Sequence, residues 1–382
     1  MNALMPSSQR LNAASRVAIT RRRLPNGFTL VELLVVLTVF LIVTAVSLPT
    51  FRSLISDQKV SQSSRTIVAY LSEARSRAVA EGRYVGVRID RLSSDAAVNF
   101  RTSAGVRLRQ LVGVPPYTGE AADAKVKFIY PTAGSTTANL EFVGVDNQLL
   151  LLYTDTNSAL YDSLEAPISD GDLIEFPGGR YFRLDLGTYV SATDTVTAQI
   201  NLDSPLSASG TPSSTFPVFH QPINNAKMSY RIHRSPVVST SQSIVFPRGI
   251  VIDTTYSGMG IDGNQLAAQG GALNQPIDIV FGPDGRVETV SVDAIGNRSV
   301  PTGLIFLCVG ESDGVQPASP FNADQRTPAN LMNLDSVWIV INPATGRSVV
   351  SPNATVSSST MPAALREARS LAILSDTLDS NP

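Results

Sequence analysis

The sequence predicts an α+β protein in which a long N-terminal helix precedes a head domain of antiparallel strands. An apolar run of 21 residues, 28–48, leads into an amphipathic helical pattern that continues to residue 81. Short stretches rich in β-forming residues then recur from residue 84 to residue 350, separated by clusters of Gly, Pro, Ser and Asn. Hydrophobic residues make up 43% of the 382 residues, so the head can bury a sizeable core.

The N-terminal 27 residues carry a strong charge bias. They contain five arginines and no acidic residue, so their removal takes the formal net charge from −2 to −7. Positive charge before an apolar run keeps an N-terminus on the cytoplasmic side. Residues 1–20 carry no folding signal, and the true start is either Met1 or Met5.

The apolar run of residues 28–48 is long enough to cross a bilayer core of about 30 Å as one helix. Glu32 is its only charged residue, and a carboxylate near the centre of a membrane helix costs about 2.5–3.5 kcal/mol. Cleavage after Gly27 would create an α-amino group on Phe28, in the same chain or in a neighbouring copy. Pairing with a neighbour's amine predicts that the protein associates with itself.

The stretch Gly27-Phe28-Thr29-Leu30-Val31-Glu32 resembles the class III signal of type IV pilins and pseudopilins. The resemblance implies that a prepilin peptidase cuts after Gly27 and methylates Phe28, and that Glu32 guides subunit docking. Pro49 matches a proline at which many pilin helices bend or melt. The implied partners are other pilin or pseudopilin subunits, the peptidase, an inner-membrane platform protein and membrane lipid. The implied location is the bacterial inner membrane, as a single-pass protein with a cytoplasmic N-terminus and a periplasmic or extracellular head.

Two other kinds of N-terminal segment account for less of this pattern. A cleaved secretory signal has an apolar region of about 7–15 residues with its small-residue cleavage site after it, whereas Gly27 precedes this run. A plain signal anchor explains the length of the run and the arginines, but it leaves Gly27, Phe28 and Glu32 unexplained.

Beyond Pro49 the helical pattern becomes amphipathic, with Ile67, Leu71, Ala74 and Ala78 at three- and four-residue spacing. This stripe predicts packing against a sheet. Residues 71–89 resemble the helix-to-strand junction of GspH/FimT-type minor pseudopilins, which favours a minor over a major subunit.

The chain divides into four predicted parts: a leader (1–27), a transmembrane and assembly helix (28–82), a pilin-like β-rich head (83–361, with a loop near 201–217), and a short C-terminal helix and tail (362–382). Residues 91–240 enlarge the family fold as a β-rich insertion. In the C-terminal helix, Leu365, Ala368, Leu371 and Leu374 share one side and predict a cap on the sheet. The predicted strands are residues 84–89, 106–112, 125–130, 140–143, 149–153, 173–176, 181–184, 195–200, 228–233, 243–246, 250–253, 277–281, 287–292, 336–342 and 347–350, with hairpin turns at 282–285 and 343–346.

No catalytic residue, cofactor or metal site is predicted. His220 and His233 lack a third ligand at an obvious spacing, and the chain contains no Gly-x-Ser-x-Gly, P-loop or Gly-x-Gly-x-x-Gly motif. Cys308 is the only cysteine, which excludes an intrachain disulfide, and its apolar neighbours predict a buried position. Asp313 and Asp324 could supply oxygens to a calcium loop, although the full EF-hand pattern is missing.

Basic residues outnumber acids between residues 59 and 109. Some FimT-type minor pilins bind DNA, and an arginine stripe would bind phosphates without sequence preference. A solvated helix face with internal ion pairs, such as Arg77 with Glu73, is the simpler interpretation of an acidic mature chain. The residues concerned are Lys59, Arg65, Arg75, Arg77, Arg83, Arg88, Arg91, Arg101, Arg107 and Arg109.

The predicted function is therefore structural: a minor pilin or pseudopilin in a type II secretion pseudopilus or a type IV pilus. The alternative is a DNA- or surface-binding subunit at a filament tip. An exported enzyme tethered by the helix is a third possibility, and it would require a polar cleft in the enlarged region.

Overall fold

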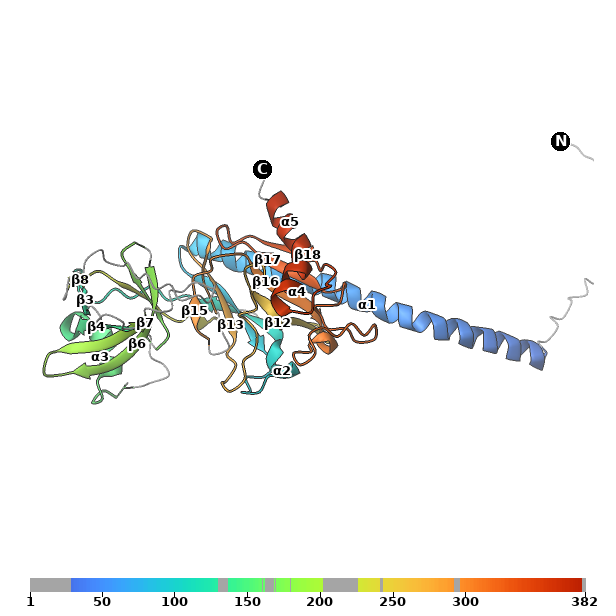
Figure 1. Cartoon of the computed structure of the whole chain (residues 1–382), viewed down its shortest axis with the longest axis horizontal. Coiled ribbons are helices and arrows are strands. Elements are labelled where there is room, and N and C mark those ends of the chain that lie inside the picture. Colours follow the sequence, from blue (N-terminus) through green and yellow to red (C-terminus); the bar gives the residue numbers. More distant parts are fainter. Residues whose placement is uncertain are drawn as a thin grey trace, which may run out of the picture. The chain divides into compact units, whose positions relative to one another are not determined.

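The computed structural model describes residues 29–129, 137–159, 161, 168, 170–178, 180–201, 226–240, 243–291 and 296–379. The chain forms two compact units, Met1–Leu54 and Ile55–Pro382. A single helix, α1 (Leu30–Glu81), contributes to both units (Figure 1).

Local sequence sets both ends of α1. The hydroxyl of Thr29 accepts a hydrogen bond from the Glu32 backbone N–H at 3.2 Å, which satisfies one of the donors left open at a helix start. At the other end Gly82 adopts a φ of 64°, and the Arg83 N–H reaches back to the Ala78 carbonyl at 3.3 Å. This is the hydrogen bond of a Schellman cap, and it confirms the predicted stop at Gly82.

The first sheet has 11 strands and is antiparallel throughout. Its central path runs β15-β14-β13-β1-β2-β12-β16-β17-β18, and β10 and β11 also pair with β2. Eight of its strands overlap predicted stretches, while β10, β15 and β16 coincide with no predicted strand. The bounds are β1 (Val85–Arg91), β2 (Ala104–Val112), β10 (Val237–Val238), β11 (Ile244–Val245), β12 (Ile250–Met259), β13 (Ile277–Phe281), β14 (Val287–Ser291), β15 (Arg298–Ser299), β16 (Ile305–Glu311), β17 (Val337–Ile341) and β18 (Ser348–Pro352), with the short helices α2 (Phe100–Ser103) and η2 (Ser312–Gly314) in its connections.

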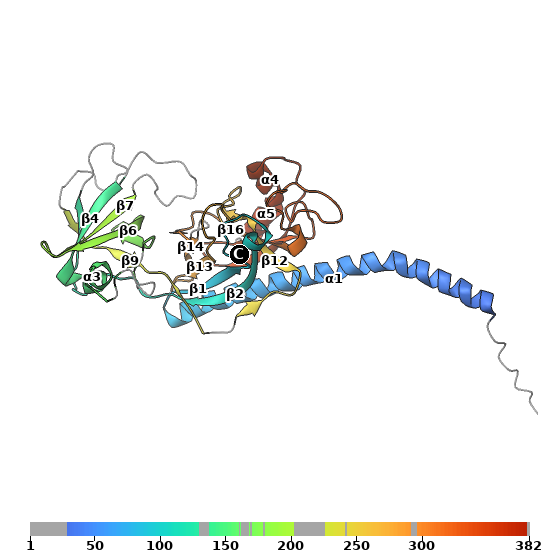
Figure 2. The same ribbon diagram turned by 90° about the horizontal axis from the view of Figure 1, so that it is seen from below.

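One face of the first sheet packs against α1, as the stripe predicted. Ile67, Leu71, Ala74 and Ala78 are all buried in one core with residues from β1, β12, β13, β16 and β17. Figure 2 shows α1 passing along β1 and β2, with α4 (Met361–Ala368) and α5 (Ser370–Asp379) on the other side of the sheet.

Arg75 ties α1 to the sheet through two hairpin turns. Its Nε donates to the Thr345 carbonyl at 2.8 Å and to the Gly285 carbonyl at 3.2 Å. The two turns also touch each other, because the Val287 N–H donates to the Pro343 carbonyl at 2.9 Å. Arg75 thus contacts two turns that are far apart in sequence. Both predicted hairpin turns are confirmed.

The opposite face is covered by the C-terminal helices, which confirms the predicted cap only in part. Leu365 and Ala368 are buried with Phe306, Trp338 and Val340. Leu371 and Leu374 are exposed, because the helix breaks at Arg369, which has φ −90° and ψ 0°. The prediction of one apolar side along the whole segment was wrong for its second half.

A second sheet of seven strands, which we call the inserted sheet, runs in the order β8-β3-β4-β7-β6-β5-β9. Its core contains none of the residues that pack on α1. The chain leaves the first sheet after Val112 and returns at Val237, and these two residues are register partners in β2 and β10. The bounds are β3 (Val126–Ile129), β4 (Thr137–Val143), β5 (Leu173–Phe176), β6 (Arg180–Val190), β7 (Thr195–Asn201), β8 (Ala226–Met228) and β9 (Arg231–His233), with η1 (Gly144–Asp146) and α3 (Gln148–Thr154) between β4 and β5.

The prediction of a strand at residues 149–153 was wrong, because these residues form α3. A short apolar run is compatible with a buried helix or with a buried strand. Here the carboxylate of Glu120 accepts hydrogen bonds from the N–H groups of Gln148 (2.8 Å) and Leu149 (3.0 Å) and so fixes a helical first turn. Most of the predicted loop at 201–217 lies outside the described residues.

Candidate assembly surface on α1

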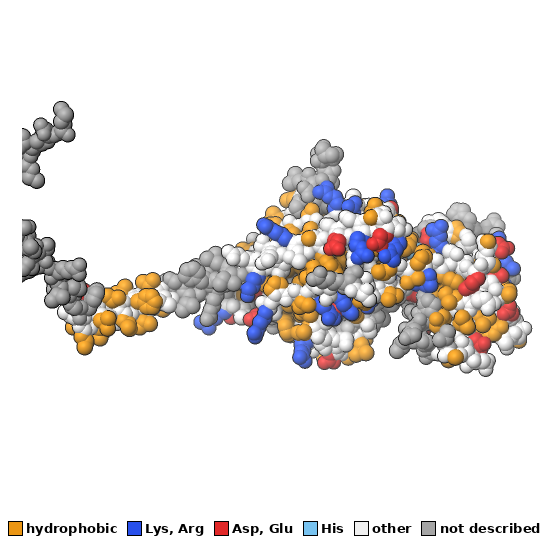
Figure 3. Space-filling view, turned by 180° about the vertical axis from the view of Figure 1, so that it is seen from behind, with side chains coloured by type: hydrophobic (Ala, Val, Ile, Leu, Met, Phe, Trp, Pro, Cys, Tyr) orange, Lys and Arg blue, Asp and Glu red, His pale blue; other side chains and the backbone are white. Residues whose placement is uncertain are grey.

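The start of α1, from residue 30 to residue 45, carries apolar side chains on every side. From Leu30 to Val43 its large hydrophobic side chains are exposed, including Leu30 at 79% and Phe40 at 66% (Figure 3). Apolar side chains all round a helix are typical of a segment covered by lipid or by other helices. This part of α1 therefore presents a surface that requires an external partner.

Glu32 is the only charged residue in the described segment from residue 29 to residue 45, and its side chain is exposed. The other polar side chains inside the helix bond to their own backbone. Thr38 donates to the Val35 carbonyl at 2.8 Å, and Thr44 donates to the Phe40 carbonyl at 2.7 Å. Within this segment, the side-chain group left to recruit a polar partner is the carboxylate of Glu32.

Sequence reasoning missed the capping role of this region. Thr29-Leu30-Val31-Glu32 has the Ser/Thr-x-x-Glu spacing of a capping box. The structure contains the hydrogen bond from the Glu32 N–H to the Thr29 hydroxyl, which is one half of that motif. The same four residues thus start the helix and place the carboxylate within its first turn, where the helix dipole favours negative charge.

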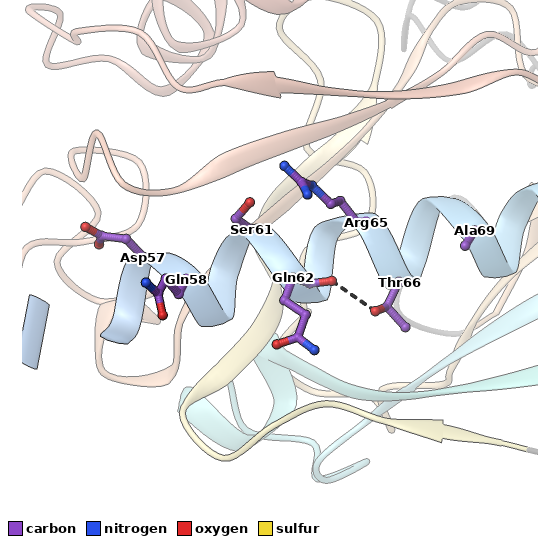
Figure 4. A pocket seen from close by; sticks show the side chains of 7 residues that line it. All are labelled: Asp57, Gln58, Ser61, Gln62, Arg65, Thr66 and Ala69. Atoms are coloured by element: carbon purple, nitrogen blue, oxygen red, sulfur yellow. Dashed lines mark hydrogen bonds between the residues drawn. The ribbon is translucent and has the colours of Figure 1, made fainter. Parts of the chain in front are cut away.

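Further along α1, the exposed face changes from apolar to polar. A hollow of about 620 Å³ runs beside residues on two rows of i, i+4 spacing (Figure 4). Burial and then the nearby carboxylates of Asp335 and Glu311 raise the pKa of Asp57 at one end of this hollow. Arg65 lies on the same row, two turns further along. The lining residues are Asp57, Gln58, Ser61, Gln62, Arg65, Thr66 and Ala69.

Residues 22–48 match the family model of the prokaryotic N-terminal methylation motif. The chain carries a type IV pilin signal. No curated protein and no solved structure matches the chain. The signal supports a type IV pilin-like or pseudopilin precursor, whose family is structural rather than enzymatic, and it implies assembly with other pilin subunits and recognition by a prepilin peptidase.

Of the predicted site residues, Gly27 and Phe28 lie outside the described residues, although both lie within the matched motif. Glu32 lies in the first turn of α1, and the helix continues through position 49, where the sequence has the proline of the predicted bend. Among the residues that the structure describes, no helix is both long and apolar enough to cross a membrane.

Within the described ranges, no group of three or more His, Cys, Asp and Glu side chains could hold a metal ion. His233 bonds to Glu175, and His220 lies outside these ranges. Asp313 and Asp324 bond within their own turns, to the Ser312 hydroxyl and the Arg326 N–H. Cys308 is buried, as predicted, and burial raises its pKa well above the ordinary value for a thiol.

Most of the basic residues between 59 and 109 form ion pairs or hydrogen bonds with other groups of the protein. Arg88 forms a bidentate pair with Asp278, with both N···O distances 2.7 Å. Arg107 and Arg109 share Asp90, and Arg91 is buried among backbone carbonyls. The expected pair of Arg77 with Glu73 is replaced by an i, i+4 pair with Glu81 at 3.1 Å, which Arg83 also contacts. These contacts leave no continuous arginine stripe along the segment.

Proposed function

We propose that the protein is a minor pilin or pseudopilin that is assembled into a type II secretion pseudopilus or a type IV pilus. The observation that carries this proposal is the apolar, uncovered start of α1, residues 30–45, with a single carboxylate in its first turn. Such a segment is suited first to a bilayer and then to a bundle of like helices in a filament. The likeness of residues 71–89 to GspH/FimT-type subunits favours a minor rather than a major subunit.

In this proposal a prepilin peptidase cuts between Gly27 and Phe28 and methylates the new N-terminus. Before assembly, residues 28–48 anchor the protein in the bacterial inner membrane, with the head on the periplasmic side. The carboxylate of Glu32 pairs with the α-amino group of Phe28 in a neighbouring subunit. This pairing would remove the cost of about 2.5–3.5 kcal/mol for an unpaired carboxylate in an apolar environment. Pro49 marks a position at which the helix can bend, and an inner-membrane platform protein is a further partner.

The proposed pairing is tested by Glu32→Ala in the full chain. We expect normal cleavage, seen by mass spectrometry as a mature protein that begins at Phe28. Incorporation into filaments should fall by about a hundredfold, the equivalent of about 2.7 kcal/mol of lost pairing. Thr38→Val is the matched control, because the Thr38 hydroxyl bonds only to the Val35 carbonyl of its own helix. A mature start at another residue would contradict the processing step, and normal incorporation of Glu32→Ala would contradict the pairing.

A DNA-binding subunit at a filament tip is less well supported. Arg88, Arg107 and Arg109 are paired with carboxylates, and Arg91 is buried. Phosphate binding would therefore depend on the remaining exposed bases, such as Lys59, Arg65 and Arg101. Gel shifts with the head domain at increasing salt would test this function, because phosphate contacts weaken steeply with salt.

A further inference from the structure

A buried histidine lies where the inserted sheet meets the first sheet. His233 in β9 has a side chain that is only 7% exposed. Its Nε2 lies 2.9 Å from Oε2 of Glu175 in β5, and its Nδ1 lies 4.0 Å from Oε1 of Glu288 in β14. Glu175 belongs to the inserted sheet and Glu288 to the first sheet. The imidazole ring therefore stands between carboxylates contributed by both sheets.

Further side chains from both sheets close this cluster, which we call the His233 junction. The ring of Tyr181 in β6 lies 5.3 Å from the imidazole, and its hydroxyl donates to Glu288 at 3.3 Å. The ring of Tyr84, just before β1, lies 6.3 Å from the imidazole, edge to face. Tyr84, His233 and Glu288 also line one small cavity of about 20 Å³, which is room for a single water molecule.

The remaining charged groups around the junction are fixed by other contacts or lie further away. Arg298 in β15 pairs with Asp172 at 2.6 Å and donates to the His233 carbonyl at 2.8 Å. Arg231 lies 4.0 Å from Glu175 and is largely exposed. Arg234 donates to the Pro115 carbonyl. Burial is the main cause that raises the pKa of Glu288; His233 and the Tyr181 hydroxyl lower it, and the Asp284 and Glu175 carboxylates raise it further.

The two contacts of His233 have different proton requirements. If neutral His233 donates from Nε2 to Glu175, its Nδ1 carries a lone pair directed toward the Glu288 carboxylate. Two acceptors then face each other at 4.0 Å. One added proton on Nδ1 turns this contact into an attraction. Histidine is the side chain that ordinarily gains its proton between about pH 5 and 8.

We propose that the His233 junction is a proton-operated lock: uptake of one proton fastens β9 and β5 of the inserted sheet to β14 of the first sheet. Deprotonation leaves a buried acceptor pair between the sheets and loosens their contact. The sign follows from linkage, because the closed junction binds the proton more tightly than the open one does. The closed state is therefore favoured at low pH and is lost as pH rises.

Hydrogen exchange of the full chain in detergent micelles tests the lock. Amide protection in residues 231–233 and 287–291, corrected for intrinsic exchange, should fall by about tenfold from about pH 5.5 to about pH 8, because the closed junction loses the proton that fastens it. In Glu288→Gln the side-chain amide can donate to neutral Nδ1, so protection should stay high at both pH values. In His233→Gln the contact to Glu175 can persist, but the pH response should vanish.

Glu141→Gln serves as the matched control, because Glu141 pairs with Lys127 at 2.7 Å within the inserted sheet. This variant should keep the wild-type pH response. A wild-type protection that is constant or rises with pH would overturn the proposal, as would a full pH response in His233→Gln. If His233→Gln fails to fold, Glu288→Gln decides alone, and an unchanged pH response there would also overturn the lock.

Discussion

The first sheet is covered on both faces, by α1 on one side and by α4 and α5 on the other, whereas the inserted sheet packs over a core of its own. Their interiors also differ. The first sheet buries the charged groups Arg91, Asp253 and Arg369. Among the described residues the inserted sheet buries fewer such groups, Asp172 and His233, beside a core of apolar side chains and tyrosines in which the Tyr230 hydroxyl bonds to Asn147.

This difference indicates which contacts stabilise each sheet. The buried charges of the first sheet hold loops that are remote in sequence. Arg91, for example, donates to the carbonyls of Thr102, Leu266 and Gln275. Removing one such group leaves several buried acceptors unpaired, so the stability of the first sheet should respond strongly to single substitutions. The inserted sheet depends on none of these residues and should be separable from them.

The comparison predicts first that the inserted sheet can be removed. Because Val112 and Val237 are register partners, residues 113–236 can be replaced by Asn-Gly, which suits a two-residue hairpin turn. The shortened protein should fold, with its denaturant m-value lower by about a third in proportion to the surface lost. The only tryptophan, Trp338, is buried in the first sheet and reports its unfolding by fluorescence. An exposed Trp338 in the absence of denaturant would contradict the separation of the two sheets.

Arg369 offers the largest expected effect of a single substitution. Its guanidinium donates to the carbonyls of Tyr256 (2.6 Å), Gly260 (2.8 Å) and Gly263 (2.9 Å) and lies 4.5 Å from the centre of the Phe306 ring. Burial lowers the pKa of Arg369 to about 9. Arg369→Ala should lower the free energy of unfolding by about 3–5 kcal/mol, because it leaves buried carbonyls unpaired and a cavity beside the ring.

The control for Arg369 lies three residues before it, in α4. Arg366 is 60% exposed and pairs with Asp262 at 2.6 Å. Arg366→Ala should cost no more than about 1 kcal/mol, as is usual for an exposed pair. Both variants are compared by urea unfolding monitored at Trp338. Equal losses would show that burial of Arg369 is not what makes it important.

The sequence predicted most strands of the first sheet, but it did not predict which residues are buried on both of its faces. The strand at 277–281 and the stripe ending at Ala78 follow directly from hydrophobic spacing. The strand β16 was missed because it is buried on both faces: Leu307 faces α1 while Phe306 faces α4, so no alternation marks it. The burial of Arg369 could not be predicted either, since an arginine in an amphipathic helix ordinarily has a side chain that is exposed to solvent.

The candidate site was predictable to a different degree. Gly27, Phe28 and Glu32 form a local motif that can be recognised from the sequence alone, and residues 22–48 match the methylation motif. The carboxylate partners of Arg88 and Arg109 could not be predicted from the sequence. Arg88 meets Asp278, which is 190 positions away, and Arg109 meets Asp90 through strand register. Charge counting along the chain therefore overstated the basic surface.

Asp253 provides a pH test of the same contrast, with the smallest expected effect. It is fully buried in β12, and burial raises its pKa from 3.8 to about 6, even though it accepts hydrogen bonds from the Thr255 N–H and the Asn330 side chain. Between about pH 4 and pH 6 the folded state holds a proton that the unfolded state has released, so stability should rise as pH falls through this window. The full change corresponds to about 3 kcal/mol for roughly two pKa units.

Urea unfolding monitored at Trp338 at about pH 7 and about pH 5 measures this rise. Asp253→Asn should abolish most of it, because the amide does not titrate. The inserted sheet has no counterpart to this group: Asp172, its fully buried carboxylate among the described residues, is paired with Arg298 at 2.6 Å. An equal rise in stability in Asp253→Asn would show that other groups cause the pH response. It would also weaken the conclusion that buried charge sets the first sheet apart.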